Sequence, residues 1–176
     1  MTGTWLPHTT PHEIGRIEHG RRSHTLGVVV HVNDGSTPGT FTWWSESGHE
    51  ADGAQVQISR NGDAFQCTPL ETLCWHAGAA NEWAVGIEHE GFGNQSDSAW
   101  LDTPQLHVSA NRAAWILHEY TLGPPRLRRN IFGHGMGGNA WGGHPDCPGA
   151  NFPWRHYMHL VSDAYYGHWG RHARAA

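Results

Sequence analysis

The sequence predicts one domain of α/β class, with a mixed α+β arrangement in which helices flank a central mixed β-sheet. Three observations carry this prediction: a run of β-branched residues at Gly27–Val32, an alternating pattern that turns at Asn61-Gly62, and two long helical patterns in the second half of the chain. Strands interspersed with helices, including at least one hairpin, are typical of a mixed sheet with helices packed on its faces. A chain of 176 residues is long enough to build one such domain around a substantial core.

The first half of the chain is expected to supply most of the strands. Residues 1–25 are polar and interrupted by Pro and Gly, so we expect them to wrap the domain as a loop with a short helical turn near His12–His19. Consecutive valines within Gly27–Val32 predict a strand that is buried on both faces. A short helix is expected over Thr40–Ser45, begun at a Thr or Ser cap. The alternation on either side of an Asn-Gly turn predicts a β-hairpin over Val56–Gln66.

The second half is expected to supply one more strand and two helices. Trp83–Gly91 reads as a short apolar strand that ends in acidic residues, and residues 91–102 are expected to form a polar loop. Thr103 is predicted to cap a long helix, with Pro at its first position and apolar residues at helical spacing up to a Gly-Pro-Pro stop. A last helix is expected to begin near Pro153 with its aromatic residues on one side.

Composition narrows the class of protein. The formal net charge of −5, with His neutral, argues against a nucleic-acid-binding protein, which needs a clustered excess of Lys and Arg. No apolar run approaches the roughly 20 residues that a membrane span needs, and the first residues lack the basic leader and apolar core of a secretory signal. We therefore expect no membrane insertion and synthesis in the cytoplasm, unless the sequence is an excised domain. We divide the single domain into an N-terminal wrap (1–25), a core (26–166) and a frayed tail (167–176).

A zinc site is predicted from three residues in two parts of the chain. His134 follows a short apolar run, and Cys147 stands thirteen positions later (147 minus 134) beyond a glycine-rich loop. His31, at the carboxyl end of Gly27–Val32, is the expected third ligand, because a metal clamp gains most by joining elements distant in sequence. Imidazole nitrogen and thiolate are ligands that zinc prefers, and three protein ligands leave the fourth position open for water. Together with Glu88, these residues predict a hydrolytic zinc site.

The chain resembles the zinc-dependent N-acetylmuramoyl-L-alanine amidases, which share a fold with peptidoglycan recognition proteins and include phage endolysins and cell-wall recycling amidases. The matching segments are Val28–His31, Trp75–Gly78, Val85–Gly91, Phe132–His134 and Cys147–Gly149. They occur in the family's order and roughly its spacing, over residues 26–165. The resemblance implies a central mixed sheet, a long helix behind it, and a groove in front with one Zn²⁺ per chain at its floor. It also implies the substrate, the amide between the lactyl group of N-acetylmuramic acid and L-alanine of the peptidoglycan stem.

The resemblance separates candidates that the residue pattern leaves open. Glu88 and Glu90 face the same side of an extended strand, and the resemblance favours Glu88 as the general base. Many relatives have Asp as the third metal ligand directly before Pro-Gly, and Cys147 rather than Asp146 occupies that position here. Relatives often carry a Lys two positions before this ligand to stabilise the oxyanion. Because Pro replaces it here and has no N–H to donate, His144 is the nearest substitute.

Three further residues are predicted to bind substrate: Trp75, His76 and Asn33. His76 has a second interpretation, in which it orients a neighbouring residue. For Asn33, turn formation after the strand is an equal explanation.

The remaining cysteines are too few for a disulfide framework. With Cys147 on the metal, Cys67 and Cys74 are expected to be buried free thiols, a bridge between them being the alternative.

The expected setting is a phage endolysin or its catalytic module, acting as a monomer and reaching the cell wall after the membrane is breached. A cytoplasmic recycling amidase is the alternative within the same chemistry. A non-catalytic peptidoglycan-binding module, or a structural zinc site closed by His144 as a fourth ligand, would belong to a different class.

Overall fold

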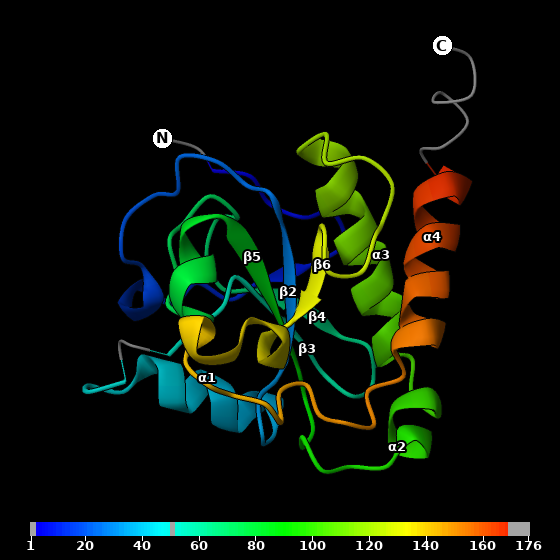
Figure 1. Cartoon of the computed structure of the whole chain (residues 1–176). Coiled ribbons are helices and arrows are strands. Elements are labelled where there is room, and N and C mark those ends of the chain that lie inside the picture. Colours follow the sequence, from blue (N-terminus) through cyan, green and yellow to red (C-terminus); the bar gives the residue numbers. More distant parts are fainter. Residues whose placement is uncertain (1–2, 50–51, 169–176) are drawn as a thin grey trace.

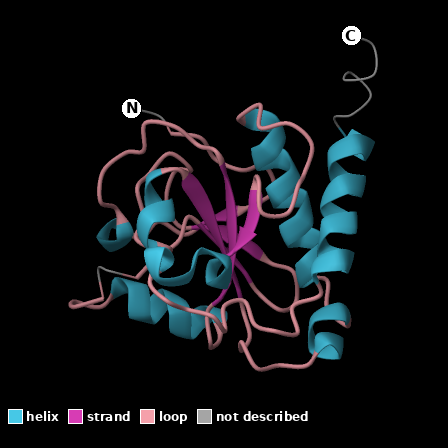
Figure 2. Ribbon diagram, in the orientation of Figure 1, coloured by secondary structure: helices cyan, strands magenta, loops and turns pink. Residues whose placement is uncertain are grey.

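A six-stranded mixed sheet forms the centre of the molecule, with helices on both sides of it (Figures 1 and 2). The computed structural model describes residues 3–49 and 52–168. The strands are β1 (Thr10–Pro11), β2 (Gly27–Val32), β3 (Val56–Ile58), β4 (Ala64–Gln66), β5 (Ala84–His89) and β6 (Ile131–Gly133), in the spatial order β1-β4-β3-β5-β2-β6. The pair β3 and β4 is antiparallel, and the other neighbouring pairs are parallel. The mixed sheet and the hairpin are therefore confirmed.

Strand β2 lies between β5 and β6 and is buried along its whole length, as its valines predict. Val28, Val30 and Val32 pack into the larger hydrophobic core, while Val29 packs into a separate cluster with residues of the opposite face. Because side chains alternate across a strand, His31 projects on the same face as Val29. The metal-ligand candidate on this strand therefore faces away from the main core.

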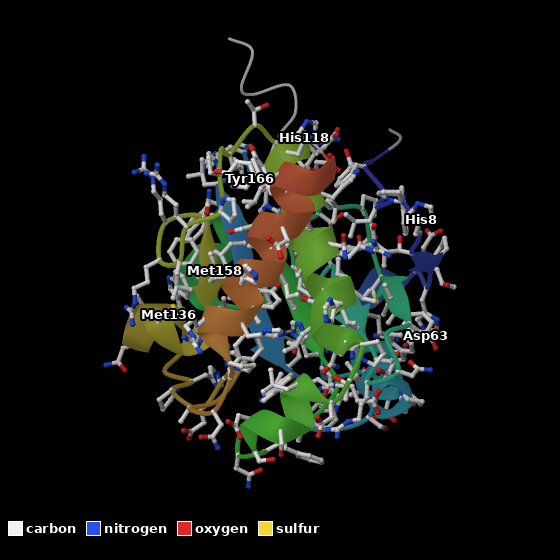
Figure 3. All side chains as sticks on the ribbon, turned by 90° about the vertical axis from the view of Figure 1, so that its right-hand side faces the viewer. His8, Asp63, His118, Met136, Met158 and Tyr166 are labelled. Carbon is white, nitrogen blue, oxygen red and sulfur yellow. The ribbon has the colours of Figure 1, made fainter. Side chains whose placement is uncertain are left out.

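The long helices lie together on one side of the sheet. Helix α3 (Gln105–Glu119) and helix α4 (Trp154–His168) run side by side, with Met158 of α4 labelled in Figure 3. Their apolar side chains belong to the same core cluster as Val28, Val30 and Val32 of β2. The other helices are η1 (Gly15–Ile17), α1 (Thr37–Ser45), η2 (Gly78–Glu82), α2 (Asp97–Leu101) and η3 (His134–Trp141). The predicted helical turn near the N-terminus and the predicted last helix are both confirmed.

Helix boundaries differ from the sequence predictions in two places. Helix α1 begins at Thr37 rather than near Thr40, because Ser36 caps it by accepting a hydrogen bond from the N–H of Gly39 at 3.2 Å. The predictions of Thr103 as the cap and Pro104 as the first residue of α3 are both wrong, since α3 begins at Gln105 with Pro104 at the cap position. The Thr103 hydroxyl instead donates to the carbonyl of Trp100 at 3.1 Å. The apolar positions of α3 are nevertheless buried at the predicted spacing.

The prediction of an uninterrupted loop over residues 91–102 is also wrong. Helix α2 occupies Asp97–Leu101, with Ser96 accepting a hydrogen bond from the N–H of Ala99 at 3.3 Å. Trp100 anchors this helix and is fully buried. A helix of five residues is too short to give a periodic apolar pattern, which is why the sequence did not reveal it.

A series of buried hydrogen bonds crosses the main core behind β2. His89 Nδ1 lies 2.8 Å from the carbonyl oxygen of His31, His89 Nε2 lies 2.7 Å from Ser109 Oγ, and Ser109 Oγ lies 2.9 Å from the Tyr157 hydroxyl. A carbonyl oxygen only accepts, so Nδ1 of His89 carries the proton and Nε2 accepts from Ser109. The chain of hydrogen bonds thus ties the end of β2 to α3 and α4.

Cys67 and Cys74 are buried free thiols, as expected. Within residues 3–49 and 52–168, no helix has both the length and the apolar character that crossing a bilayer requires. Most of the predicted tail, residues 169–176, lies outside the described residues.

Candidate active site

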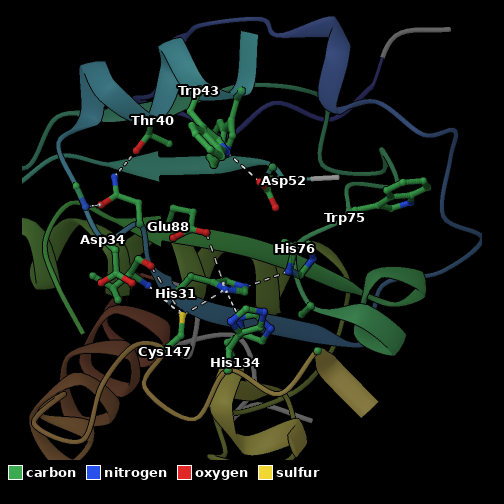
Figure 4. Close-up of a pocket in the computed structure, with 18 of the residues that line it drawn as sticks. His31, Asp34, Thr40, Trp43, Asp52, Trp75, His76, Glu88, His134 and Cys147 are labelled. Atoms are coloured by element: carbon green, nitrogen blue, oxygen red, sulfur yellow. Dashed lines mark hydrogen bonds and ion pairs between the residues drawn. The ribbon is translucent and has the colours of Figure 1, made fainter. Parts of the chain in front are cut away.

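A cavity of about 760 Å³ opens on the face of the sheet opposite to α3 and α4. The ends of β2 and β5 form its floor, and residues of α1, η2 and η3 line its walls. Figure 4 shows His31, His134 and Cys147 close together at the floor, with Glu88 beside them. Trp43 lies on the wall that α1 contributes.

The three predicted metal ligands converge in this cavity. His31, His134 and Cys147 each offer one ligand atom within 4.8 Å of the other two. The two Nδ1 atoms are 3.1 Å apart, and Cys147 Sγ is 3.6 Å from Nδ1 of His31. Tetrahedral zinc bound through nitrogen and sulfur would separate such atoms by roughly 3.3 Å for two nitrogens and roughly 3.6 Å for nitrogen and sulfur. The spacing and the donor chemistry both fit zinc.

The protein holds two of these side chains with their ligand atoms turned inward. His134 Nε2 lies 2.7 Å from the carbonyl oxygen of Trp141, so this nitrogen carries the proton and Nδ1 keeps its lone pair. Cys147 Sγ accepts a hydrogen bond from the N–H of Val32 at 3.4 Å. The exposed Asp146 does not belong to the cluster.

Burial governs the protonation of the ligands. It lowers the pKa of His31 well below its usual value, helped by neighbouring histidines, and it also lowers the pKa of His134. Both rings are therefore neutral near pH 7, which is the form that binds a metal. Burial raises the pKa of the Cys147 thiol, and a bound cation would favour its thiolate form.

Glu88 stands beside the metal ligands because of strand register. It pairs with His31 across the parallel strands β5 and β2, and its Oε1 lies 3.9 Å from His31 Nδ1. The side chain is only 14% exposed, and Oε2 has no hydrogen-bond partner among the described residues. Burial, followed by the charges of Asp34 and Asp52, raises the pKa of Glu88 to about 8. This carboxyl group can therefore both take up and release a proton near neutral pH.

Glu90 lies elsewhere. Strand β5 ends at His89, and Glu90 Oε2 accepts hydrogen bonds from the Thr37 hydroxyl at 3.1 Å and the Arg60 N–H at 2.9 Å. Glu90 thus joins the start of α1 to the β-hairpin, whereas Glu88 lines the cavity.

The sequence pattern described as N-acetylmuramoyl-L-alanine amidase matches residues 21–150.

The chain belongs to this amidase family.

Its relatives support the assignment. The amidase is 28% identical over 155 residues to N-acetylmuramoyl-L-alanine amidase A of Achromobacter lyticus, a match that covers 80% of this chain and 85% of that protein. Its fold is similar to that of the Staphylococcus aureus hydrolase AmiA, with a TM-score of 0.75, 16% identity, and 96% of this chain and 88% of AmiA covered. It is also similar in fold to the endolysin LysCS of Clostridium intestinale, with a TM-score of 0.59, 18% identity, and 90% and 98% of the two chains covered.

The amidase places the predicted oxyanion donor, His144, at the exposed rim of the cavity. The centre of its ring lies 4.7 Å from that of His134, with the planes tilted by 36°. His144 therefore has its polar atoms near the ligand cluster and open to solvent.

The three predicted substrate-binding residues of the amidase occupy different environments. Trp75 lines the cavity, is 46% exposed and stacks on His19 at 3.8 Å. His76 also lines the cavity but is buried, with Nδ1 3.0 Å from His31 Nε2. Asn33 also lines the cavity, and its Oδ1 accepts hydrogen bonds from two backbone N–H groups at 3.1 and 3.2 Å, which fixes the turn after β2.

One acidic cavity residue was not among the sequence candidates. Asp52 accepts a hydrogen bond from Trp43 Nε1 at 2.9 Å, and both residues line the cavity. Trp43 in turn stacks on His49 with ring centres 3.4 Å apart. Asp52 lies in a polar stretch outside the recognised motifs, so no pattern in the sequence connects it to the site.

Proposed function

We propose that this amidase hydrolyses peptidoglycan with one zinc ion held by His31, His134 and Cys147, and with Glu88 as the general base. The bond cleaved is the amide between the lactyl group of N-acetylmuramic acid and L-alanine of the stem peptide. The observation that carries the proposal is the convergence of the three ligand atoms within 4.8 Å in the cavity that Glu88 also lines.

Zinc bound there supplies a Lewis acid and lowers the pKa of a water molecule. Glu88 takes up the proton that the attacking water loses and passes it to the amine of L-alanine as the carbon–nitrogen bond breaks. Its Oε2 has no partner among the described residues and so is available to water, while a pKa raised to about 8 suits both halves of the transfer. His144 donates an N–H to the carbonyl oxygen of the scissile amide as negative charge develops there.

Substitution of Glu88 tests the proposal. Glu88→Gln removes the proton acceptor but keeps the size of the side chain, so turnover is expected to fall by about 10²–10⁴-fold while zinc content is unchanged. Turnover is measured as amine released from muramyl peptides, and zinc by elemental analysis. Glu90→Gln is the matched control and should retain turnover, because Glu90 supports the hairpin outside the cavity. Loss of zinc from Glu88→Gln would make Glu88 a ligand and overturn its role as base.

His144→Ala tests the oxyanion donor. Turnover is expected to fall by roughly 10²-fold with zinc retained, because the ring stands at the rim and outside the ligand cluster. Wild-type rates would remove His144 from the mechanism, and loss of zinc would favour a closed structural site with four ligands.

We further propose that the amidase acts as a phage endolysin or its catalytic module. Its similarity in fold to an endolysin supports this setting. The alternative, a recycling amidase, would act on soluble wall fragments. Dye release from labelled, cross-linked sacculi is therefore compared with hydrolysis of soluble muramyl peptides. Turnover on sacculi supports the endolysin, turnover confined to soluble peptides supports recycling, and binding without any turnover would indicate a non-catalytic module.

A further inference from the structure

We infer that His76 is a positioning residue whose buried imidazole selects the zinc-binding tautomer of His31. The inference rests on the proposed zinc site and adds a residue that touches neither the metal nor the reacting atoms. In this interpretation, His76 orients the proposed ligand His31 and does not contact substrate.

The hydrogen-bond directions follow from a single carbonyl group. His76 Nε2 lies 3.3 Å from the carbonyl oxygen of Ala84, which only accepts, so this nitrogen carries the proton. His76 Nδ1 then holds a lone pair and faces His31 Nε2 at 3.0 Å. His31 Nε2 must therefore donate, which leaves the lone pair of its ring on Nδ1.

That tautomer is the one the zinc site needs. His31 Nδ1 points toward the other two ligands, 3.1 Å from His134 Nδ1 and 3.6 Å from Cys147 Sγ. A metal-binding histidine usually donates its second N–H to a carboxylate or carbonyl oxygen. Here the acceptor is a neutral imidazole, and the carbonyl of Ala84 fixes its orientation in turn.

The position of His76 is itself fixed from two directions. Its backbone N–H and that of Ala77 both donate to Asn81 Oδ1, at 2.9 and 2.6 Å. Its ring lies against Gly86 of β5, where an added Cβ atom would be 2.9 Å from the ring carbon Cγ and 3.0 Å from Nδ1. A side chain on this strand position would push the ring away from His31. The residue is buried, with both ring nitrogens occupied by protein partners, so it offers substrate no free polar atom.

Two variants of similar size separate the hydrogen bond from packing. His76→Asn can still accept from His31 Nε2 through its side-chain oxygen, whereas His76→Leu fills the space without any acceptor. Zinc affinity of the full chain is measured by competition with a chelator of known affinity. We expect His76→Leu to bind zinc about 10–100-fold more weakly than the wild type, and His76→Asn to recover most of that loss. Trp75→Ala is the neighbouring control and should leave zinc affinity unchanged, because its ring stacks on His19 away from the ligands.

Cobalt(II) substitution provides a readout that does not depend on activity. The visible spectrum of the cobalt-loaded protein should change with His76→Leu and match the wild type with His76→Asn, since it reports the geometry around the metal. Equal zinc affinities and equal spectra in the two variants would overturn the role of His76 in selecting the tautomer. Normal zinc affinity with a raised KM in both would make it a substrate contact instead. A wild-type chain that binds no zinc would overturn the proposed metal site, and this inference with it.

Discussion

At the scale of single residues, Cys147 is the proposed zinc ligand whose protonation depends most on a bound cation. Burial raises the pKa of its thiol, and among the described residues the N–H of Val32 donates a hydrogen bond to the sulfur at 3.4 Å. The proposed histidine ligands, His31 and His134, are in contrast already neutral near pH 7, because burial lowers the pKa of each. Metal binding must therefore displace the thiol proton while leaving the protonation of the two imidazoles unchanged.

Cys147→Ser should weaken zinc binding by more than about 100-fold, because loss of a direct ligand costs more than loss of an outer partner. The measurement is zinc affinity by chelator competition. Asp146→Asn is the control, since Asp146 is exposed and outside the ligand cluster, and it should bind zinc like the wild type. The reverse result, with Asp146→Asn impaired and Cys147→Ser normal, would move the third ligand to Asp146.

At the scale of elements, strand register brings His31 and Glu88 together, which the residue pattern alone does not predict. The run of valines predicts β2 and the short apolar run before Glu88 predicts β5, but nothing in either segment states that His31 pairs with Glu88. The alternation of β5 likewise leaves Glu88 and Glu90 equivalent. They separate because β5 ends at His89 and Glu90 then bonds to the hairpin.

The parts that the sequence did not reveal share a physical cause. Helix α2 is five residues long and is held by the burial of Trp100 rather than by a repeating pattern. Asp52 reaches the cavity only because Trp43 of α1 lies opposite its loop. Both depend on side-chain contacts formed only in the folded chain, and no local pattern in the sequence signals such contacts. The candidate metal ligands could be predicted because each stands in a recognisable motif, with His31 and His134 at strand ends and Cys147 directly before Pro148-Gly149.

The chain of hydrogen bonds through His89 gives a prediction at this scale. Burial lowers the pKa of His89 from 6.5 to about 4, so the unfolded chain binds a proton over a pH range in which the folded protein does not. The resulting stability is fully present above pH 6.5 and is lost as the pH falls toward 4. At about 1.4 kcal/mol for each pH unit, about 3 kcal/mol of the free energy of unfolding depends on pH through this residue.

His89→Gln should therefore show a shallower loss of stability between pH 7 and pH 5 than the wild type. The difference is expected to be about 2 kcal/mol in the free energy of unfolding by urea. Both proteins are measured with a chelator present, so that His31 and His134 titrate alike in the two. Parallel stability curves over this range would show that His89 is not held neutral in the fold.

At the scale of the whole molecule, the two faces of the sheet differ in what packs against them. The face under α3 and α4 carries the main apolar core, and the opposite face carries the cavity with its polar floor. Three acidic side chains line that cavity, at Asp34, Asp52 and Glu88, and none of the described residues that line it is Arg. The chain contains no Lys at all. A divalent cation in the proposed zinc site would add positive charge to this acidic cavity.

Zinc should also act as a clamp on the fold, because its three proposed ligands come from separate elements: β2, the start of η3 and the loop before Pro148. His31 and Cys147 are 116 positions apart. Binding that favours only the folded chain adds about 4 kcal/mol when free zinc exceeds its dissociation constant 1,000-fold. For a chain of this size, that corresponds to a rise of roughly 10 °C in the unfolding temperature. Thermal unfolding is followed in a zinc buffer and after chelation, with His134→Ala as the control that should unfold at the same temperature in both. A wild-type midpoint that does not move, or a shift of equal size in His134→Ala, would mean that zinc is not held between these elements.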